Sequence, residues 1–231
     1  MKNIFQFIKE SISAVMFPAV CVICGMSLGQ SQKFICTFCA HNRFQKAVST
    51  KEDLINLPEI VQGRFALWQF DKGGYLQDLL HKLKYHRLTG VGEDLGNILG
   101  DEFKKTNLFK SLTDELEILP VPLHSKKKRK RGFNQAFFIA KGIADVTGFN
   151  IIELGVVTRV KNTDTQTGFS LDKRRKNISN AFKVERPNKI EDKTILIVDD
   201  VFTTGATAFE LVQELQKANV RKILIATVAQ A

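Results

Sequence analysis

The sequence predicts an α/β fold, in which a mainly parallel sheet is flanked by helices, joined to a small N-terminal unit with four cysteines. Strand-like apolar runs alternate with helical patterns of about ten to fifteen residues, which is typical of βαβ units. The cysteines all lie between positions 21 and 39. With 231 residues, 44% of them hydrophobic, the chain is long enough for one full domain and a small appendage. We expect an N-terminal helix and finger over residues 1–55 and the α/β domain over residues 56–231.

The first segment, Ile4 to Val22, is apolar in patches. Its apolar side chains recur at helical spacing, as Phe5, Ile8, Ile12 and Val15. Polar side chains interrupt the segment and Pro18 would break a longer helix, so we expect neither a membrane span nor a signal peptide. An amphipathic helix that packs on its own protein is the preferred interpretation, and binding to a membrane surface is the alternative.

The cysteines form two CxxC pairs separated by 11 residues, Cys21 with Cys24 and Cys36 with Cys39. Four thiolates at this spacing suit tetrahedral zinc, and nearby glycines allow tight turns. Such a closed site would be structural and would supply folding energy that so small a segment lacks. The alternatives are redox CxxC motifs or incidental buried cysteines. Because the larger domain has no cysteine, the sequence favours a cytoplasmic location over a disulfide-stabilised secreted protein.

The larger domain begins with an alternating strand, Arg64 to Phe70, followed by a turn. Two helices come next, with apolar faces formed by Leu76, Leu79, Leu80 and Leu83 and then by Val91, Leu95, Ile98, Leu99 and Phe103. Glu117 to Leu123 predicts a strand that ends in a proline-stiffened loop. The helix after it has an apolar face of Phe133, Phe137, Ala140 and Ile143, and Gly148 ends it. Ile151 to Val160 and Ile223 to Val228 predict further strands, so ligands are expected at the carboxyl ends of the sheet.

The formal net charge of +10 is concentrated between Val121 and Arg186, where 15 Lys and Arg accompany 5 Asp and Glu. This excess indicates polyanionic ligands, either diphosphates or nucleic acid. Its densest part, Ser125 to Gly132, is expected to be a loop at a strand end. We assign most of its cations to a solvated loop and single out Arg131, just before the next helix, as a candidate phosphate ligand.

A polar segment follows, with Arg159, Thr163, Gln166, Arg174, Asn177, Ala181 and Phe182 at intervals. Its hydroxyl, amide and guanidinium groups suit a mobile lid that covers a polyphosphate and excludes water. Taken alone, the segment fits an ordinary surface loop equally well.

The stretch ILIVDDVFTTGAT, Ile195 to Thr207, is the most informative. A buried strand is expected to end at Asp199, and a loop of hydroxyl and small residues then opens a helix over Ala208 to Leu215, whose free N–H groups can bind an anion. An ordinary turn with a capped helix is the alternative. The stretch resembles the phosphoribosyl pyrophosphate (PRPP) motif of type I phosphoribosyltransferases. That resemblance implies a PRPP site formed by Val198, Asp199, Asp200, Thr203, Thr204, Gly205, Ala206 and Thr207.

Four features together resemble the ComF family of phosphoribosyltransferase-like proteins: the four cysteines, PVPLH-x6-RGFNQA (Pro120 to Ala136), R-x3-T-x2-Q-x7-R-x2-N (Arg159 to Asn177) and VDDVFTTGAT. Lys84-Tyr85 also resembles a family element, whereas Phe169 stands where leucine is expected. The resemblance covers nearly the whole chain. It implies a type I phosphoribosyltransferase fold with an N-terminal zinc finger and a link to DNA uptake and natural transformation, with no agreed acceptor.

In an active transferase, the 5′-phosphate of PRPP would bind the loop of Thr203 to Thr207, its ribose hydroxyls would bind Asp199 and Asp200, and Mg²⁺ would bridge ribose and pyrophosphate oxygens. Arg131, Arg159 and Arg174 are the candidates for the pyrophosphate side. A nucleobase or nucleotide would be the acceptor, in nucleotide metabolism or beside the DNA-uptake machinery.

The rival hypothesis is a single-stranded DNA-binding competence protein that uses the fold without catalysis, which the basic middle third and the finger favour. A PRPP-sensing regulator is a third hypothesis, but the sequence has no helix-turn-helix signal.

Overall fold

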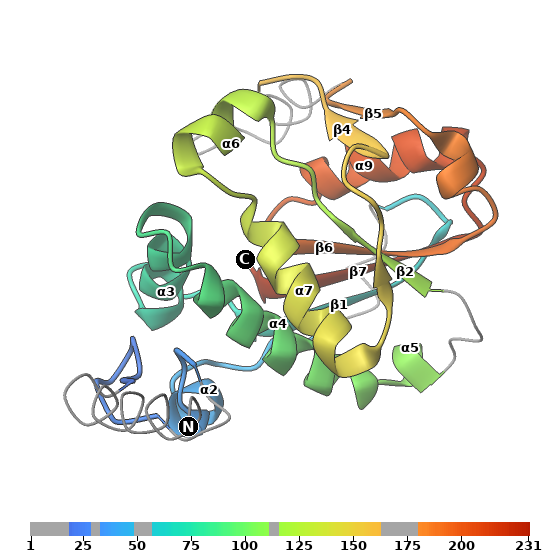
Figure 1. Ribbon diagram of the computed structural model, residues 1–231. Helices are drawn as coiled ribbons and strands as arrows, with labels where there is room; N and C mark the ends of the chain where they lie inside the picture. Colours follow the sequence, from blue (N-terminus) through green and yellow to red (C-terminus); the bar gives the residue numbers. More distant parts are fainter. Residues whose placement is uncertain (1–18, 29–32, 49–56, 111–115, 163–179) are drawn as a thin grey trace, which may run out of the picture.

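A wholly parallel five-stranded sheet occupies the centre of the computed structural model, which describes residues 19–28, 33–48, 57–110, 116–162 and 180–231 (Figure 1). In spatial order the strands are β1 (Val61–Gln69), β7 (Lys222–Gln230), β6 (Thr194–Phe202), β2 (Leu116–Pro120) and β3 (Asn150–Ile151). The predicted α/β class is confirmed. Within the described ranges, no helix combines the length and the apolar character needed to cross a membrane.

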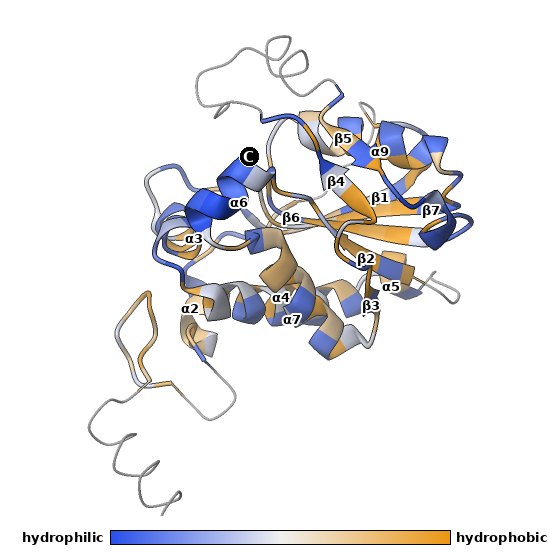
Figure 2. Cartoon of the chain, turned by 45° about the horizontal axis from the view of Figure 1, so that its top comes forward, coloured by the Kyte–Doolittle hydropathy of each residue, from blue (hydrophilic) through white to orange (hydrophobic). Residues whose placement is uncertain are grey.

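Helices cover both faces of the sheet (Figure 1). One face carries α3 (Tyr75–Tyr85), α4 (Thr89–Lys104) and α7 (Gln135–Thr147), and the other carries α9 (Ala206–Lys217). Because successive side chains of a strand point to opposite faces, Leu196 and Val198 of β6 join the first core, while Ile195 and Ile197 join the second. The strands are accordingly apolar on both faces, as their mainly orange colour in Figure 2 shows.

Helices α4 and α7 pack backbone to backbone through two glycines. A Cβ atom at Gly96 would lie 2.1 Å from the carbonyl oxygen of Ile139, and one at Gly142 would lie 2.1 Å from the carbonyl oxygen of Glu93. No side chain fits in either position. This contact fixes α7, whose first residue, Gln135, lies at the carboxyl edge of the sheet. Of the predicted apolar face of α7, Ala140 and Ile143 are buried, but Phe137 is only partly buried and Ile139 takes the inner position.

The basic run forms a helix, α6 (Ser125–Arg131), so the predicted loop is wrong. Lys and Arg are good helix formers, and the His124 ring accepts a hydrogen bond from the N–H of Lys126 at the helix start. Gly132, with a φ of 91°, ends the helix in the left-handed region. The expectation of a solvated segment holds, because most of the α6 side chains are exposed.

The predicted strand from Ile151 to Val160 is two separate strands. β3 is the edge of the main sheet, whereas β4 (Val157–Arg159) pairs antiparallel with β5 (Phe182–Val184) in a second sheet. The chain turns between them at Gly155, which has a φ of 88°. The segment predicted as a lid therefore begins and ends at the β4–β5 pair. Its residues Thr163, Gln166, Arg174 and Asn177 lie outside the described residues.

The finger, with its helix α2 (Thr37–Asn42), packs on α3 and α4 and shares their hydrophobic core. The buried carboxylate of Asp94 in α4 accepts hydrogen bonds from the N–H groups of Phe34 and Ile35, at 2.7 and 3.0 Å. On α3, Lys82 donates to the carbonyl of Val22 at 3.0 Å. Residues 1–18, which include most of the segment predicted as an N-terminal helix, lie outside the described residues. The proposed domain boundary at residues 55–56 also lies outside them. The short helices α5 (Asn107–Lys110) and η2 (Pro187–Lys189) connect the main elements.

Candidate functional site

The acidic pair lies near the carboxyl end of the central strand, β6. The strand does not end at Asp199, as expected, but continues to Phe202, because Val201 and Phe202 still pair with Ala229 and Gln230 of β7. Asp199 and Asp200 are consecutive strand residues, so their side chains leave opposite faces of the sheet. Asp199 shares its face with Ile197, beside the loop that leads into α9. Asp200 turns toward α3 and α7.

Beyond Asp199, the loop and the first turn of α9 form a small polar pocket. Its polar lining consists of Asp199, Thr203, Gly205, Ala206, Thr207 and Thr227. Gly205 has a φ of 73° and precedes the helix, whose first backbone hydrogen bond runs from Phe209 to Gly205 at 2.7 Å. The N–H groups of Ala206, Thr207 and Ala208 therefore have no partner within the helix. The enclosed volume is about 30 Å³, the share of one water molecule, so a larger anion would bind at the mouth.

Thr227 of β7 adds an unexpected polar group to this pocket. It lies opposite Asp199 in the β6–β7 ladder and is 1% exposed. Its Oγ1 is buried and has no hydrogen-bond partner among the described residues, and the same holds for Oγ1 of Thr204. A buried hydroxyl without a partner is costly, so these groups suit a site that a polar ligand completes.

Asp200 is buried and fully engaged. It forms an ion pair with Lys84, the penultimate residue of α3, and accepts a hydrogen bond of 3.1 Å from Gln135 Nε2. Burial alone would raise the pKa of Asp200, but the Lys84 ammonium and the hydrogen bonds outweigh it and hold that pKa below its usual value. For Lys84, burial opposes the charged form, yet Asp200 raises its pKa. The pair therefore stays ionised.

Asp199 has the opposite electrostatics. Burial, followed by the negative charge of Asp200, raises the pKa of Asp199 well above its usual value. Its Oδ1 accepts a hydrogen bond of 2.8 Å from the N–H of Asp200. The Lys84 ammonium lowers the pKa of Asp199 in part. On the pocket side, burial lowers the pKa of Arg159 and Asp199 raises it in part. Adjacent carboxyls with opposed pKa shifts are typical of functional sites.

The structure brings two of the three predicted arginines to the site. Arg131, at the end of α6, donates to Gln135, and its guanidinium lies 5.7 Å from the centroid of the Tyr85 ring. Arg159, at the end of β4, lies 5.2 Å from the centroid of the Phe182 ring. Arg174 lies outside the described residues. Val198 is fully buried and contributes its backbone, since its carbonyl accepts from the N–H of Val121.

Sequence reasoning missed Gln135 and Thr227 and gave Lys84 no role. Lys84 follows the leucine face of α3, where a charged residue beside buried leucines is a signal for a buried partner. Thr227 is the lone hydroxyl in the otherwise apolar strand ILIATVA, which is a similar signal. Gln135 carries no signal in the local pattern.

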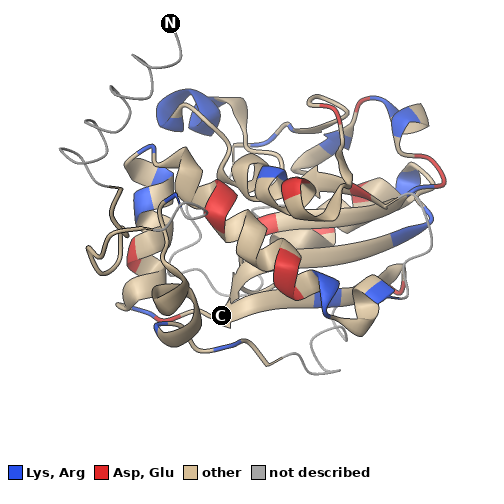
Figure 3. Ribbon diagram, turned by 60° about the horizontal axis from the view of Figure 1, so that its bottom comes forward, with Lys and Arg blue, Asp and Glu red and all other residues tan. Residues whose placement is uncertain are grey.

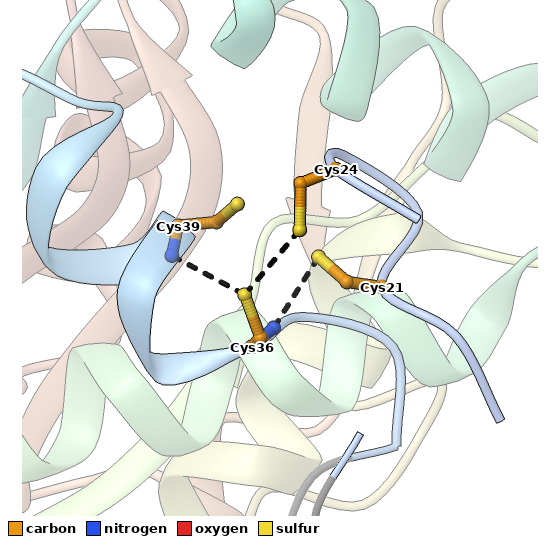
Figure 4. Close-up of side chains that lie close together, drawn as sticks. All are labelled: Cys21, Cys24, Cys36 and Cys39. Carbon is orange, nitrogen blue, oxygen red and sulfur yellow. Dashed lines mark hydrogen bonds between the residues drawn. The ribbon is translucent and has the colours of Figure 1, made fainter. Parts of the chain in front are cut away.

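The four cysteines converge as expected (Figure 4). Their Sγ atoms all lie within 4.8 Å of one another, and those of Cys24 and Cys36 are 3.7 Å apart. Zinc–sulfur bonds of about 2.3 Å in a tetrahedron give sulfur separations of about 3.8 Å, so the residues fit a metal such as zinc. Burial would raise the pKa of the Cys21 thiol, but backbone N–H groups, chiefly that of Cys36, lower it to about 6. Burial and the neighbouring thiols raise the pKa of Cys39, so metal binding there must release a proton.

A larger cavity of about 430 Å³ lies where α6, the start of α7 and β4 meet. Phe133 and Phe137 supply aromatic walls, and Lys128 and Arg159 supply charge. Arg159 thus lies between this cavity and Asp199.

Several known proteins are similar to this chain. Residues 131–231 match the family model described as phosphoribosyl transferase domain. The chain is 31% identical over 214 residues to DNA utilization protein YhgH of Salmonella typhi, covering 86% of this chain and 91% of that protein. It is 31% identical over 160 residues to competence protein F of Haemophilus influenzae, covering 68% of each. An adenine phosphoribosyltransferase structure from Saccharomyces cerevisiae superposes with a TM-score of 0.37 at 15% identity, covering 63% of this chain and 72% of that one. The chain belongs to the ComF family and carries a phosphoribosyltransferase domain behind its four-cysteine finger.

Proposed function

We propose that this protein binds PRPP and transfers its ribose 5-phosphate to an acceptor during the handling of DNA taken up by the cell. The observation that carries the proposal is the pocket where Asp199, the buried Thr227 hydroxyl and the free N–H groups of α9 converge. Together these groups suit a ligand with both hydroxyls and a phosphate. The printed names of the relatives, DNA utilization protein and competence protein, support the connection with DNA.

The parts of PRPP are assigned by their chemistry. The 5′-phosphate would bind at the mouth of the pocket, on the N–H groups and hydroxyls of Thr203 to Thr207, where the dipole of α9 favours negative charge. The ribose hydroxyls would donate to the acidic pair, with Asp199 facing them. The pyrophosphate would lie toward Arg131, Arg159 and Arg174, because guanidinium groups bind phosphate oxygens in pairs.

Mg²⁺ fits this site, because the Asp199 carboxylate supplies the hard oxygen ligand that the ion prefers beside pyrophosphate oxygens. When bound, it neutralises charge on the departing pyrophosphate. The residues of the chain do the rest. Asp199 stabilises the positive charge that develops at the anomeric carbon, and Arg131 and Arg159 hold the leaving group in line. For the finger we propose structural zinc on Cys21, Cys24, Cys36 and Cys39.

We propose a nucleobase or a nucleotide as the acceptor. The cavity of about 430 Å³ supports this, since aromatic walls at Phe133 and Phe137 suit a planar ring and Lys128 suits a phosphate. Arg159 lines this cavity and interacts with Asp199, which supports an acceptor close to the reacting carbon. The absence of cysteine from the α/β domain supports a cytoplasmic location.

The reaction is tested by incubating the protein with PRPP, Mg²⁺ and a panel of nucleobases, nucleosides, nucleotides and oligonucleotides. Mass spectrometry should detect an acceptor that has gained ribose 5-phosphate, with one pyrophosphate released per adduct. If PRPP binds but no member of the panel gains ribose 5-phosphate, the protein is a PRPP-binding protein and the transferase proposal is wrong.

Single-stranded DNA binding is the second candidate, and α6 is the observation that favours it. Figure 3 shows α6 as a continuous blue helix, and its sequence SKKKRKR contains no acidic residue. Replacing the exposed Lys126, Lys128, Arg129 and Lys130 with Gln retains helix propensity and removes four charges. If α6 binds DNA phosphates, the slope of log affinity against log salt for an oligothymidine should fall by about 3. An unchanged slope would exclude α6 as the DNA-binding element.

A further inference from the structure

The two carboxyls of the acidic pair have different surroundings, although they are adjacent in sequence. Asp199 faces the pocket with Ile197, Val201 and Thr227. Asp200 faces the other side of the sheet, where the ends of α3 and α6 and the start of α7 meet. A strand cannot present two consecutive side chains to the same face without a bulge, and β6 keeps a regular register with β7 through Asp199.

The Asp200 side is a chain of polar contacts. Oδ2 of Asp200 meets the ammonium of Lys84, and Oδ1 accepts from Gln135 Nε2 at 3.1 Å. The other end of the Gln135 amide accepts from Arg131, whose guanidinium lies over the ring of Tyr85. Both oxygens of Asp200 are therefore engaged by the protein. Arg131, a candidate pyrophosphate ligand, belongs to the same series of polar contacts.

We propose that Lys84 is a positioning residue of the PRPP site, whose ammonium fixes the rotamer of Asp200 and so leaves Asp199 as the carboxyl that meets the ligand. Asp200 acts through its partners, because it anchors Gln135 and, through Gln135, Arg131. The role of Lys84 in PRPP binding rests on the proposed function, whereas its contact with Asp200 is tested without PRPP.

The charges around Asp200 come from every element packed against it. Lys84 of α3 lowers the pKa of Asp200, and so does a side-chain hydrogen bond with Asp199 of β6. Arg131 of α6 lies beyond Gln135 of α7, and Arg159 of β4 acts on Asp199. Lys84 is the cation in direct contact, with 25% of its side chain exposed against 6% for that of Asp200. Removing Lys84 takes the cationic partner from Oδ2 of Asp200, so the carboxylate loses the contact that holds it in its present rotamer.

The first arm of the test determines crystal structures of the ligand-free protein and its variants. Lys84→Met removes the charge, Lys84→Arg keeps it, and Lys193→Met is a matched control. Lys193 forms a half-buried pair with Glu117 at 2.5 Å, at the opposite end of β6. We expect the Asp200 carboxylate to leave its wild-type rotamer in K84M and to lose its hydrogen bond with Gln135 Nε2, whereas K84R and K193M should keep both. An Asp200 side chain in K84M that keeps the wild-type rotamer and the Gln135 contact would overturn the proposal.

The second arm measures PRPP affinity with Mg²⁺ by calorimetry at pH 7, in K84M, K84R, Asp200→Asn and the double variant. K84M should weaken PRPP binding about tenfold and K84R should restore most of it, because the cation that holds Asp200, and through Gln135 holds Arg131, is first lost and then replaced. If Lys84 acts through Asp200, adding K84M to D200N should cost less than about twofold more. A further tenfold loss would mean that Lys84 contacts PRPP itself, and the positioning role would be wrong.

Two results need separate treatment. If K84M alone does not fold, the double variant, which removes both buried charges, should regain the fold, and its comparison with D200N decides the second arm. If the wild type binds no PRPP, the proposed function fails while the crystallographic arm still decides the role of Lys84 toward Asp200.

Discussion

Thr227 combines full burial with a hydroxyl that has no partner among the described residues. Such a group costs about 1–3 kcal/mol of stability, which a purely structural position would have no reason to retain. Its place opposite Asp199, in the pocket at the start of α9, gives the reason. The hydroxyl is available to a polar ligand that enters from the loop.

Replacing Thr227 with Val should therefore affect stability and ligand binding in opposite directions. Thermal unfolding should occur at the wild-type temperature or slightly above it, because an unsatisfied polar group is lost. PRPP affinity should fall about tenfold, the value of about one lost hydrogen bond to a charged ligand. Calorimetry and circular dichroism measure the two effects. Thr194→Val, at the other end of β6, should leave PRPP affinity unchanged; equal losses in both variants would contradict the assignment.

At the residue scale, the sequence predicted the part of the site whose residues are adjacent in one segment. A strand, two acids and a hydroxyl loop before a helix are contiguous, so the sequence could predict that Asp199 and the loop lie together near the carboxyl end of β6. The partners of Asp200 come from α3 and α7, which the fold brings together. The sequence of α3 can indicate that Lys84 has a buried partner but not which one, and the pairing of Asp200 with Lys84 was not predicted.

At the scale of helices and strands, α4 and α7 support the site. Their close contact at Gly96 and Gly142 fixes the position of α7 and so of its first residue, Gln135. Strong helical periodicity predicted both helices, but the need for glycine depends on how closely their backbones approach. The basic run was predicted as a loop because its charge indicates exposure to solvent. It forms a helix because Lys and Arg have high helix propensity. The strand expected over Ile151 to Val160 was divided because Gly155 redirects the chain.

Gly142→Ala should lower the free energy of unfolding by about 3 kcal/mol, since the new methyl group would overlap the backbone of α4. Urea denaturation followed by circular dichroism measures the change. The exposed Asp145→Ala on the same helix should change it by less than about 0.5 kcal/mol. A Gly142 variant as stable as the wild type would show that α4 and α7 can separate without loss.

On the scale of the whole molecule, the finger and the α/β domain share one hydrophobic core. Cys21, Cys36 and Cys39 belong to the same cluster as the buried residues of α3 and α4, and Asp94 binds two backbone N–H groups of the finger. The sequence predicted the cysteine site but could not predict this docking. Because α3 also carries Lys84, the same helices support both the four-cysteine finger and the acidic pair.

Removing the metal with a chelator should therefore destabilise one face of the sheet more than the other. Hydrogen exchange should increase throughout α3 and α4, while α9, on the other core, keeps its protection. Asp94→Ala in the zinc-loaded protein should increase exchange in α4 with the finger still closed. Exchange that changes only within residues 19–48 would mean that the finger is energetically independent.

The most direct test of the PRPP site is calorimetry of PRPP with Mg²⁺ on the wild type and on Asp199→Asn, at pH 8. The variant keeps the shape of the side chain and removes the charge that faces the pocket. We predict a PRPP dissociation constant at least about tenfold higher in the variant, because a charged acceptor of ribose hydroxyls is lost. Thermal stability should stay the same or rise, because burial and the charge of Asp200 disfavour the ionised Asp199 carboxyl. Equal affinities in the two proteins would contradict the assignment of this pocket to PRPP.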